Sequence, residues 1–231
     1  MSLSTYLSEQ LKKMGADIVG FGKLEGYVGD EYAVGISVGV AVPVDIVKDL
    51  LEAPTLAYYE YYYEATKKLD KIAKTCEDYL SSMGYTTFAQ TTDRNFIGGS
   101  GTITRLPHKT VATCAGLGWI GKNGLLVTPE YGPAVRLTSI LTHAKLDCGE
   151  PIEESKCGDC TICRDVCPGQ AIEGILWGKG LYNKRLIDID KCHSTQVKIM
   201  KEQTGIEVDL CGKCFACCRY TQKYINNPLI K

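Results

Sequence analysis

The sequence has no apolar run long enough to cross a membrane. Its longest apolar stretch, residues 33–47, is interrupted by glycines, a proline and Asp45, whereas a bilayer span needs about 20 consecutive apolar residues. The amino terminus places Glu9, Lys12 and Lys13 among its apolar positions, so it lacks the continuous apolar core of a secretory signal. These absences predict a soluble, cytoplasmic protein that makes no use of a membrane.

An excess of charge of one sign is also missing. The 26 Lys and Arg residues nearly balance the 27 Asp and Glu residues, which leaves a formal net charge of −1. This balance argues against nucleic-acid binding through bulk positive charge, because phosphate contacts depend on clustered Lys and Arg. Hydrophobic residues make up 45% of the 231 residues, a value typical of a chain that buries a core, and the length favours one large domain or two unequal ones.

Cysteine, by contrast, is abundant. The chain has 12 cysteines, nine of them between Cys157 and Cys218, whereas Cys76, Cys114 and Cys148 lie alone upstream. In a reducing compartment such a number indicates metal or redox chemistry rather than a disulfide framework. We interpret the three isolated cysteines as packing residues, since a buried free cysteine behaves as a small hydrophobic side chain.

The uneven distribution of cysteines predicts a domain boundary near residue 150, between a first domain, 1–150, and a second, 151–231. In the first domain, apolar residues repeat at helical spacing over 3–14 and 65–83, and a glycine follows each stripe. Helices mixed with strands predict a layered structure of the α/β or α+β class, and we assign α+β. The candidate strands are residues 18–24, 33–42, 85–90, 109–114, 125–128 and 135–141.

The first cysteine run has the spacing of an iron–sulfur ligand set. Cys157, Cys160, Cys163 and Cys167, followed by Pro168, spell C-x2-C-x2-C-x3-C-P. In this run three thiolates bind one [4Fe–4S] cluster and the fourth binds a second cluster. A structural zinc site normally draws its four ligands from two pairs, so zinc is disfavoured, and the run predicts two [4Fe–4S] clusters.

The second cysteine set is less regular, because Arg219 stands where a ferredoxin-type repeat would have its proline. Read as C-x2-C-x3-C, this set supplies three ligands, and Cys192 completes a total of eight. Cys217 is an alternative to Cys218, and the spacing favours Cys218. The predicted ligands are Cys157, Cys160, Cys163 and Cys218 for one cluster, and Cys167, Cys192, Cys211 and Cys214 for the other.

A glycine-rich loop over residues 116–124 precedes the cysteines. It satisfies both G-x-G-x-x-G and G-x-x-x-x-G-K, yet neither motif has its expected context. A dinucleotide site needs an acidic residue about 20 positions further on, where Arg136 stands, and a P-loop needs Ser or Thr after its lysine, where Asn123 stands. The bulky Trp119 indicates instead that the loop forms a wall for a large, flat, apolar ligand.

Two segments, AGLGWIGKNGLLVTPEYGPAVRLTSILT and CGDCTICRDVCPGQAI, closely resemble epoxyqueuosine reductases and, more distantly, corrinoid-dependent reductive dehalogenases. The resemblance is clear between Leu106 and Cys218 and weak before them. It implies a nitroreductase-like α/β domain that binds cobalamin and a bicluster ferredoxin-like domain, with cluster ligation that crosses between the two cysteine runs. By motif position it implies that the corrinoid, in its base-off form, contacts Thr102, Gly118, Lys122, Leu126, Leu137 and Ile140.

Two features depart from the epoxyqueuosine reductase pattern. Thr102 stands fourteen residues before Gly116, where that family has a proton-donating aspartate, and a threonine hydroxyl is not a useful acid near neutral pH. The chain also ends at Lys231, without the helical-repeat extension that those enzymes use on tRNA. We therefore expect that tRNA is not a partner.

The resemblance implies a cobalamin-dependent reductase in which two [4Fe–4S] clusters pass electrons from a ferredoxin or flavodoxin to a bound corrinoid that reduces a small electrophilic molecule. Its proton donor stays open among Asp93, His108 and the tyrosines of residues 58–63. Three alternatives also stay open. They are an electron-transfer or activating protein that reduces a corrinoid without substrate chemistry of its own, an epoxyqueuosine reductase proper, and a plain two-cluster ferredoxin.

Overall fold

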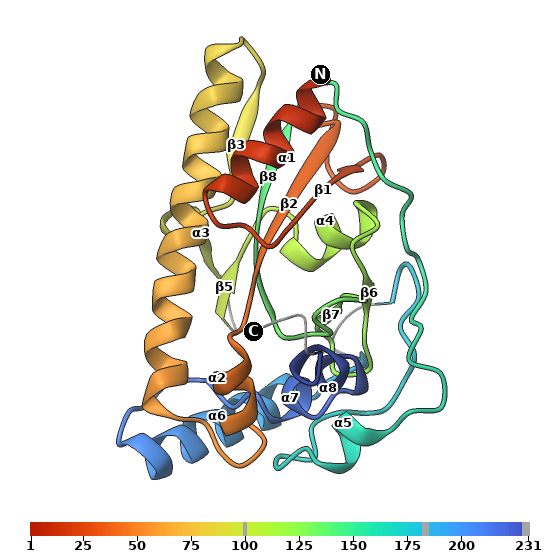
Figure 1. Cartoon of the computed structure of the whole chain (residues 1–231). Helices are drawn as coiled ribbons and strands as arrows, with labels where there is room; N and C mark the ends of the chain where they lie inside the picture. Colours follow the sequence, from red (N-terminus) through yellow and green to blue (C-terminus); the bar gives the residue numbers. More distant parts are fainter. Residues whose placement is uncertain (99–100, 182–184, 228–231) are drawn as a thin grey trace. The chain divides into compact units, whose positions relative to one another are not determined.

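The computed structural model describes residues 1–98, 101–181 and 185–227, which form a mixed α/β structure (Figure 1). They divide into two compact units, and neither unit is continuous in the sequence. One chain crossing lies close to the division expected near residue 150, but there are four others, so the units do not coincide with that division. Unit 1 contains Met1–Val40, Glu64–Gly118 and Arg136–Ile152, and unit 2 contains Ala41–Tyr63, Trp119–Val135 and Glu153–Lys231.

Unit 1 is built on a four-stranded sheet. Its strands, in spatial order, are β1 (Ile18–Lys23), β2 (Val34–Ala41), β8 (Val135–Thr142) and β3 (Thr87–Ala89). β1 pairs antiparallel with β2, and β3 pairs antiparallel with β8. A separate hairpin joins β4 (Phe96–Gly98) to β5 (Gly101–Ile103), and the 3-10 turn η1 (Thr92–Arg94) precedes it.

A largely apolar sequence explains β2, one of the two central strands of unit 1. Every residue of β2 except Ala41 is buried, and so are the last five residues of β8. A strand that is buried on both faces has a nearly continuous apolar sequence rather than an alternating one, as residues 33–42 do. Helix α1 (Leu3–Lys13) contacts β1 and begins at Ser2, whose hydroxyl accepts a hydrogen bond from the Thr5 amide.

The segment predicted as a strand over residues 109–114 is instead a helix, α4 (His108–Cys114). Its β-branched residues favoured the strand prediction. However, the fixed φ of Pro107 leads the chain into the first helical turn. The helix packs closely on β1, because a Cβ atom at Gly22 would lie 2.4 Å from the Cys114 carbonyl carbon. Glycine at this position therefore permits the contact.

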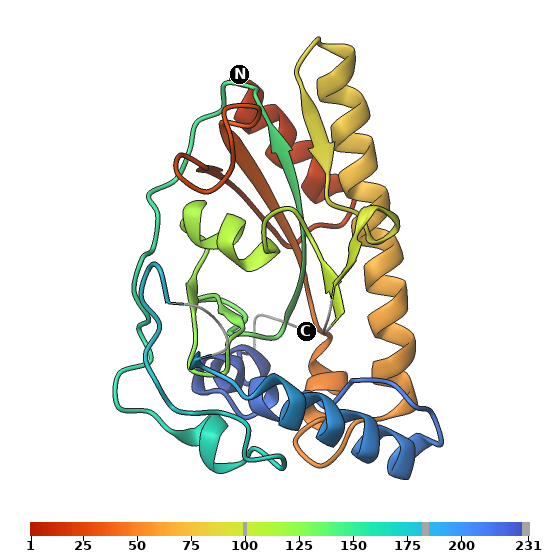
Figure 2. The same cartoon turned by 180° about the vertical axis from the view of Figure 1, so that it is seen from behind.

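Helix α3 (Leu56–Ser82) contributes its first two turns to unit 2 and the rest to unit 1. Gly84, at φ +85°, follows its end, and the chain returns beside the helix as β3 (Figure 2). Within the described ranges, neither α3 nor any other helix is long and apolar enough to cross a membrane. The buried residues of its unit 1 part have the spacing from which the helix was predicted; they are Ala65, Leu69, Ile72, Ala73, Cys76 and Leu80.

Unit 2 consists of short helices and one small hairpin. Its helices beyond α3 are α2 (Val44–Asp49), α5 (Ile162–Asp165), α6 (Ile189–Thr204), α7 (Lys213–Ala216) and α8 (Arg219–Ile225). The hairpin pairs β6 (Trp119–Ile120) with β7 (Leu126–Val127), so the strand predicted over 125–128 is shorter than expected.

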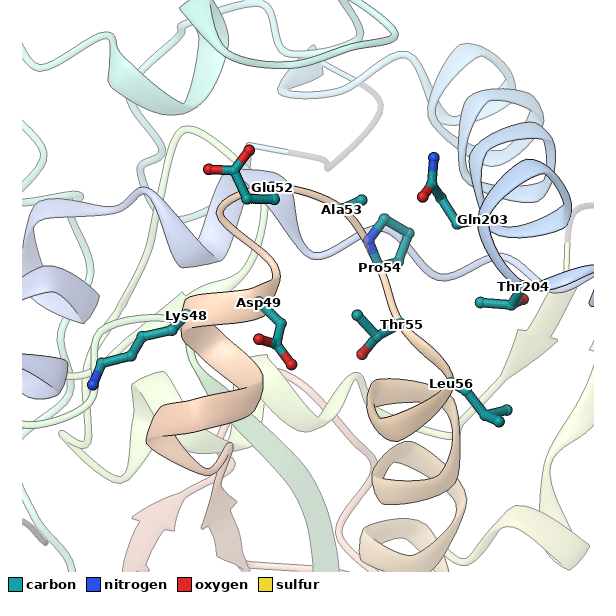
Figure 3. A pocket seen from close by; sticks show the side chains of 9 residues that line it. All are labelled: Lys48, Asp49, Glu52, Ala53, Pro54, Thr55, Leu56, Gln203 and Thr204. Carbon is teal, nitrogen blue, oxygen red and sulfur yellow. The ribbon is translucent and has the colours of Figure 1, made fainter.

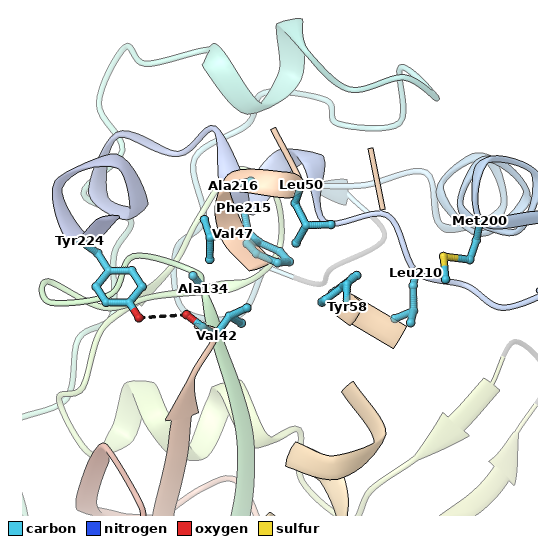
Figure 4. Packing of buried hydrophobic residues seen from close by; sticks show 10 residues of the cluster. All are labelled: Val42, Val47, Leu50, Tyr58, Ala134, Met200, Leu210, Phe215, Ala216 and Tyr224. Atoms are coloured by element: carbon cyan, nitrogen blue, oxygen red, sulfur yellow. Dashed lines mark hydrogen bonds between the residues drawn. The ribbon is translucent and has the colours of Figure 1, made fainter. Parts of the chain in front are cut away.

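The core of unit 2 gathers apolar residues from segments far apart in the sequence (Figure 4). Phe215 packs its ring edge against Tyr58, with the ring centroids 6.0 Å apart. The Tyr224 hydroxyl donates a hydrogen bond of 2.9 Å to the Val42 carbonyl. This core fixes α2, α7 and α8 next to one another, and α7 carries one of the predicted cluster ligands.

Candidate metal centre

Four of the predicted ligands in unit 2 surround one pocket. Cys157 and Cys160 lie in a loop, and Cys163 lies in α5. Cys218 precedes the first turn of α8 as its N-cap residue. The first cysteine group is therefore assembled from both cysteine runs. The pocket is lined by Cys157, Cys160, Cys163, Cys218, Lys122, Asn123, Val127, Arg219 and Tyr220.

The electrostatics of the first cysteine group suit a bound metal cluster. Burial raises the pKa of Cys163 to about 11, and the neighbouring thiols of Cys157, Cys218 and Cys160 add to this rise because their negative charges would repel. Metal ligation requires thiolates. The chemistry of this donor set therefore fits a cationic iron–sulfur core, which would offset both the burial and the mutual repulsion.

The second cysteine group contains Cys167, Cys192, Cys211 and Cys214. Burial raises the pKa of Cys211 most, and Cys192 and Cys167 add to the rise. Burial raises the pKa of Cys214 well above its usual value, and the nearby Cys211 adds to the rise. Cys163 of the first group and Cys217 also act on Cys214, so the assignment of these ligands to a separate cluster stays a prediction.

Hydrogen bonds fix the sulfur atoms of the second cysteine group. Cys192 lies in the first turn of α6, and the Gln196 amide donates to its Sγ at 2.8 Å. The side chain of Asp188, the N-cap residue, accepts from the Lys191 amide and holds the start of this helix. The Ala171 amide donates a hydrogen bond of 3.4 Å to Cys167 Sγ. Such contacts orient thiolate ligands and tune the metal that they hold.

Cys217 lies beside both groups but outside the lined pocket. Its Sγ donates to the Cys214 carbonyl at 3.6 Å. Burial raises its pKa to about 12, and Cys163 and Cys218 contribute further. Cys218, by contrast, lines the pocket with the other three thiols. The choice of Cys218 over Cys217 as a ligand stays a prediction.

No three His, Cys, Asp or Glu side chains in the part of the chain that the structure describes converge on a single metal ion. The four thiolates of a [4Fe–4S] cluster bind four different irons at the corners of a cube. Such ligands surround a volume and do not meet at a point.

The glycine-rich loop touches both cysteine groups, which its sequence did not reveal. The Lys122 ammonium donates a hydrogen bond of 3.1 Å to the Cys160 carbonyl, and the Asn123 amide donates one of 3.4 Å to the Cys214 carbonyl. Both side chains are buried. Trp119, expected to lie against a flat ligand, is buried with its ring centroid 5.0 Å from that of Tyr220.

The residues predicted to contact a corrinoid are divided between the units. Gly118, Leu137 and Ile140 belong to unit 1, as does the backbone of Thr102 in β5, opposite Ile97. Lys122 and Leu126 belong to unit 2. Ile140 is completely buried, so its side chain can contact a ligand only if unit 1 rearranges. The corrinoid contacts stay predictions.

Two candidate proton donors are poor acids in this structure. Burial and the nearby Arg136 charge lower the pKa of His108 to about 4, so its imidazole is neutral at pH 7. Hydrogen bonds from Thr91 and Lys74 lower the pKa of Asp93 to about 2, so its carboxyl group is ionised. Neither group holds a proton that it could donate near neutral pH.

The tyrosine candidates lie on the first turns of α3. Tyr58 is buried in the unit 2 core, and Tyr61 donates to the Ala41 carbonyl at 2.7 Å. Tyr63 is exposed, and partial burial together with Tyr59 and Tyr62 raises its pKa. Packing therefore accounts for Tyr58.

A second pocket in unit 2 has a different chemical character (Figure 3). It lies between the end of α2, the loop that follows and the end of α6. It offers carboxylate, amide and ammonium groups but no thiol or imidazole. Its lining residues are Lys48, Asp49, Glu52, Ala53, Pro54, Thr55, Leu56, Gln203 and Thr204.

Solved structures of known proteins show which proteins share the fold of this chain. No protein-family model matches the chain. Its structure superposes on a catabolic reductive dehalogenase in complex with 3-bromo-4-hydroxybenzoic acid, with a TM-score of 0.71 and 18% identity over 96% of this chain and 34% of the dehalogenase. It also superposes on the epoxyqueuosine reductase of Streptococcus thermophilus, with a TM-score of 0.59 and 21% identity over 96% of this chain and 67% of that protein. The chain therefore shares a fold with both.

The relatives found by sequence similarity are epoxyqueuosine reductases. An epoxyqueuosine reductase of Lactococcus garvieae is 34% identical over 115 residues, which are 50% of this chain and 29% of that enzyme. One of Gloeobacter violaceus is 36% identical over 123 residues, 49% of this chain and 35% of that enzyme. The chain spans about a third of the length of these relatives. The predicted resemblance to epoxyqueuosine reductases is confirmed, and the likeness to a reductive dehalogenase is one of fold.

Proposed function

We propose that this protein is an iron–sulfur and cobalamin-dependent oxidoreductase that reduces a small electrophilic molecule. The observation that supports the proposal is a pocket lined by four thiols from both cysteine runs, those of Cys157, Cys160, Cys163 and Cys218. The charges of Cys167 and Cys192 act on Cys211, and those of Cys192 and Cys211 act on Cys214, which supports a second set of ligands. Two clusters in series suit one-electron transfer. The resemblance to epoxyqueuosine reductases and reductive dehalogenases supplies the corrinoid, since both families use iron–sulfur clusters and cobalamin.

The side chains of unit 2 would perform defined tasks. The first cysteine group would hold one [4Fe–4S] cluster and the second group the other. Lys122 and Asn123 would fix the backbone of each group through the Cys160 and Cys214 carbonyls. A bound corrinoid would supply a strongly reducing metal, and the clusters would deliver its electrons from a ferredoxin or flavodoxin.

The corrinoid is expected to bind base-off. His108 is engaged through Nδ1 with the Ser139 hydroxyl at 2.8 Å, and the two other histidines, His143 and His193, are far from it in sequence. A lower ligand from this chain is therefore not expected. Electron paramagnetic resonance of cob(II)alamin added to the protein should lack nitrogen hyperfine splitting; splitting, or no binding at micromolar protein, would contradict the proposal.

A second candidate function is epoxyqueuosine reduction on tRNA. The named relatives are epoxyqueuosine reductases, and one solved epoxyqueuosine reductase that this chain resembles is in complex with an epoxyqueuosine-modified tRNA-Tyr stem loop. Against it stands Thr102 at the position of the family's aspartate. The discriminating assay supplies tRNA that contains epoxyqueuosine, cobalamin and a strong reductant. Queuosine formed at about one turnover per second would establish this function instead.

Catalytic turnover of a substrate distinguishes a reductase from a protein that only reduces a corrinoid. With clusters, cobalamin and a strong reductant present, a reductase consumes a halogenated or epoxide substrate catalytically, whereas an activating protein reduces the corrinoid and leaves these substrates intact. A plain two-cluster ferredoxin is distinguished by a cobalamin spectrum that does not change when the protein is added.

A further inference from the structure

The turn between β6 and β7 does more than close its hairpin. The hairpin is held by its own backbone, since the Gly121 amide donates to the Leu125 carbonyl and the Gly124 amide to the Gly121 carbonyl, both at 2.8 Å. The Asn123 side chain adds to this turn, since its Oδ1 accepts a hydrogen bond of 3.3 Å from the Leu125 amide, whereas the hydrogen bond of Lys122 goes to the Cys160 carbonyl, outside the turn. Both side chains are buried and extend to the cysteine groups, so their contacts there call for a separate explanation.

Lys122 brings a buried positive charge to the first cysteine group. Its side chain is 6% exposed, and it lines the pocket with the four thiols. Its hydrogen-bond acceptor is a neutral carbonyl, that of Cys160, and no carboxylate lines the pocket among the described residues. A buried ammonium is costly unless an opposite charge compensates it. Four thiolates on an iron–sulfur core would provide that charge.

The charges that face the two groups differ. Lys122 and Arg219 both line the first pocket. Beside the second group, the positive charge of Lys213 acts on Cys211 and the negative charge of Asp209 acts on Cys192. The loop itself contributes only a neutral amide there, that of Asn123. The pocket of the first group thus has two positively charged side chains in its lining, Lys122 and Arg219.

We propose that the Lys122 ammonium raises the reduction potential of the cluster held by the first cysteine group, and so makes that cluster the electron acceptor of the pair. This inference rests on the proposed function, because it requires a [4Fe–4S] cluster in the pocket. Reduction adds one electron, taken from the other cluster or from a chemical reductant, to a centre that already carries the negative charge of its thiolates. A nearby cation in a poorly solvated pocket stabilises the reduced form more than the oxidised form. Lys122 is a positioning and tuning residue for electron transfer.

The test is a redox titration followed by electron paramagnetic resonance on reconstituted protein. Lys122→Gln keeps a donor for the Cys160 carbonyl but removes the charge, and Lys122→Arg keeps the charge. The signal of the first cluster is the one that Cys218→Ser removes. We expect Lys122→Gln to lower the midpoint potential of the first cluster and to leave that of the second unchanged, with Lys122→Arg close to the unmodified protein.

Lys156→Met is the matched control, because Lys156 adjoins Cys157 in sequence but is exposed to water, where its charge is screened. Lys122→Gln with full iron content and an unshifted potential would overturn the inference. Loss of the first cluster alone in Lys122→Gln, with retention in Lys122→Arg, would support it by showing that the charge acts on this centre. If the unmodified protein takes up no [4Fe–4S] cluster, the proposed function itself fails.

Discussion

The two units of this protein are stabilised in different ways. Unit 1 pairs four strands in one sheet and fills its interior with apolar side chains. Unit 2 has an apolar core around α2, α7 and α8, but α5 and α7 are only four residues long and carry or adjoin partly buried thiols. Apolar burial is sufficient to hold a sheet of this kind. The region of α5 and α7 depends in addition on what its thiols bind.

Removal of the clusters should produce the largest difference in local stability between the two units. Structural metal binding commonly contributes many kcal/mol to folding, whereas the sheet contains none of the predicted ligands. In protein stripped with a chelator under reducing conditions, hydrogen exchange in α5 and α7 should accelerate more than about 100-fold, roughly 3 kcal/mol. Exchange in β2 should change little. If exchange accelerates equally in β2 and in α5 and α7, or in none of them, the two units do not differ in their dependence on the clusters.

Serine substitutions at two adjacent cysteines of unit 2 compare a predicted cluster ligand with its neighbour. Cys218→Ser removes a thiol that lines the first pocket, so we expect loss of about half of the iron. Cys217→Ser removes a thiol whose contact is the Cys214 carbonyl, so the iron content should stay unchanged. Iron analysis after anaerobic reconstitution measures both variants. The reverse result would show that Cys217 is the ligand.

The apolar core of unit 1 should be sensitive to truncation without an effect on iron. Leu141 has no exposed surface and packs in the core cluster with Leu24 and Val111. Leu141→Ala should cost about 2–5 kcal/mol of the free energy of unfolding, measured by hydrogen exchange in β8, with iron content retained. Met83→Ala, at a residue that is 48% exposed, should change stability by less than about 0.5 kcal/mol.

Acid should weaken unit 1 through His108. Its pKa falls from the usual 6.5 to about 4 in the folded protein, so between these values the unfolded chain binds a proton that the folded chain does not. The contribution of neutral His108 is complete above pH 6.5 and is lost as the pH falls to 4, on the order of 3 kcal/mol. In apoprotein, hydrogen exchange in α4 and β8 should therefore accelerate as the pH is lowered, after correction for intrinsic rates. The variant His108→Gln should show a weaker pH dependence of hydrogen exchange in α4 and β8. An unchanged pH dependence in this variant would contradict the role given to His108.

The sequence predicted most of the regular structure, and the reasons for its failures are physical. Helical spacing identified α1 and α3, and a largely apolar run identified β2, because both signals are local; the candidate strand over 135–141 corresponds to β8. The prediction of a strand at α4 was wrong, since the propensity of its β-branched residues was weaker than the effect of Pro107 and of packing on β1. The single boundary near residue 150 could not anticipate segments that leave one unit and return.

Ligand spacing is local within each cysteine run, so the sequence could propose cluster ligands, and their assignment to two clusters stays a prediction. The contacts of the glycine-rich loop could not be predicted from the sequence. Lys122 and Asn123 reach carbonyl groups 38 and 91 residues further along the chain, and no local pattern encodes such a contact. The buried lysine was predicted to contact a corrinoid, and its hydrogen bond to Cys160 emerged only from the tertiary structure.

Iron and acid-labile sulfide analysis of anaerobically reconstituted protein tests the central claim most directly, because the claim is that unit 2 holds two groups of four cluster-binding thiols. Each [4Fe–4S] cluster contains four irons and four sulfides. The account predicts about eight of each per chain, together with the absorption and paramagnetic signals of two clusters. A stable value of about four, or zinc in place of iron, would contradict it.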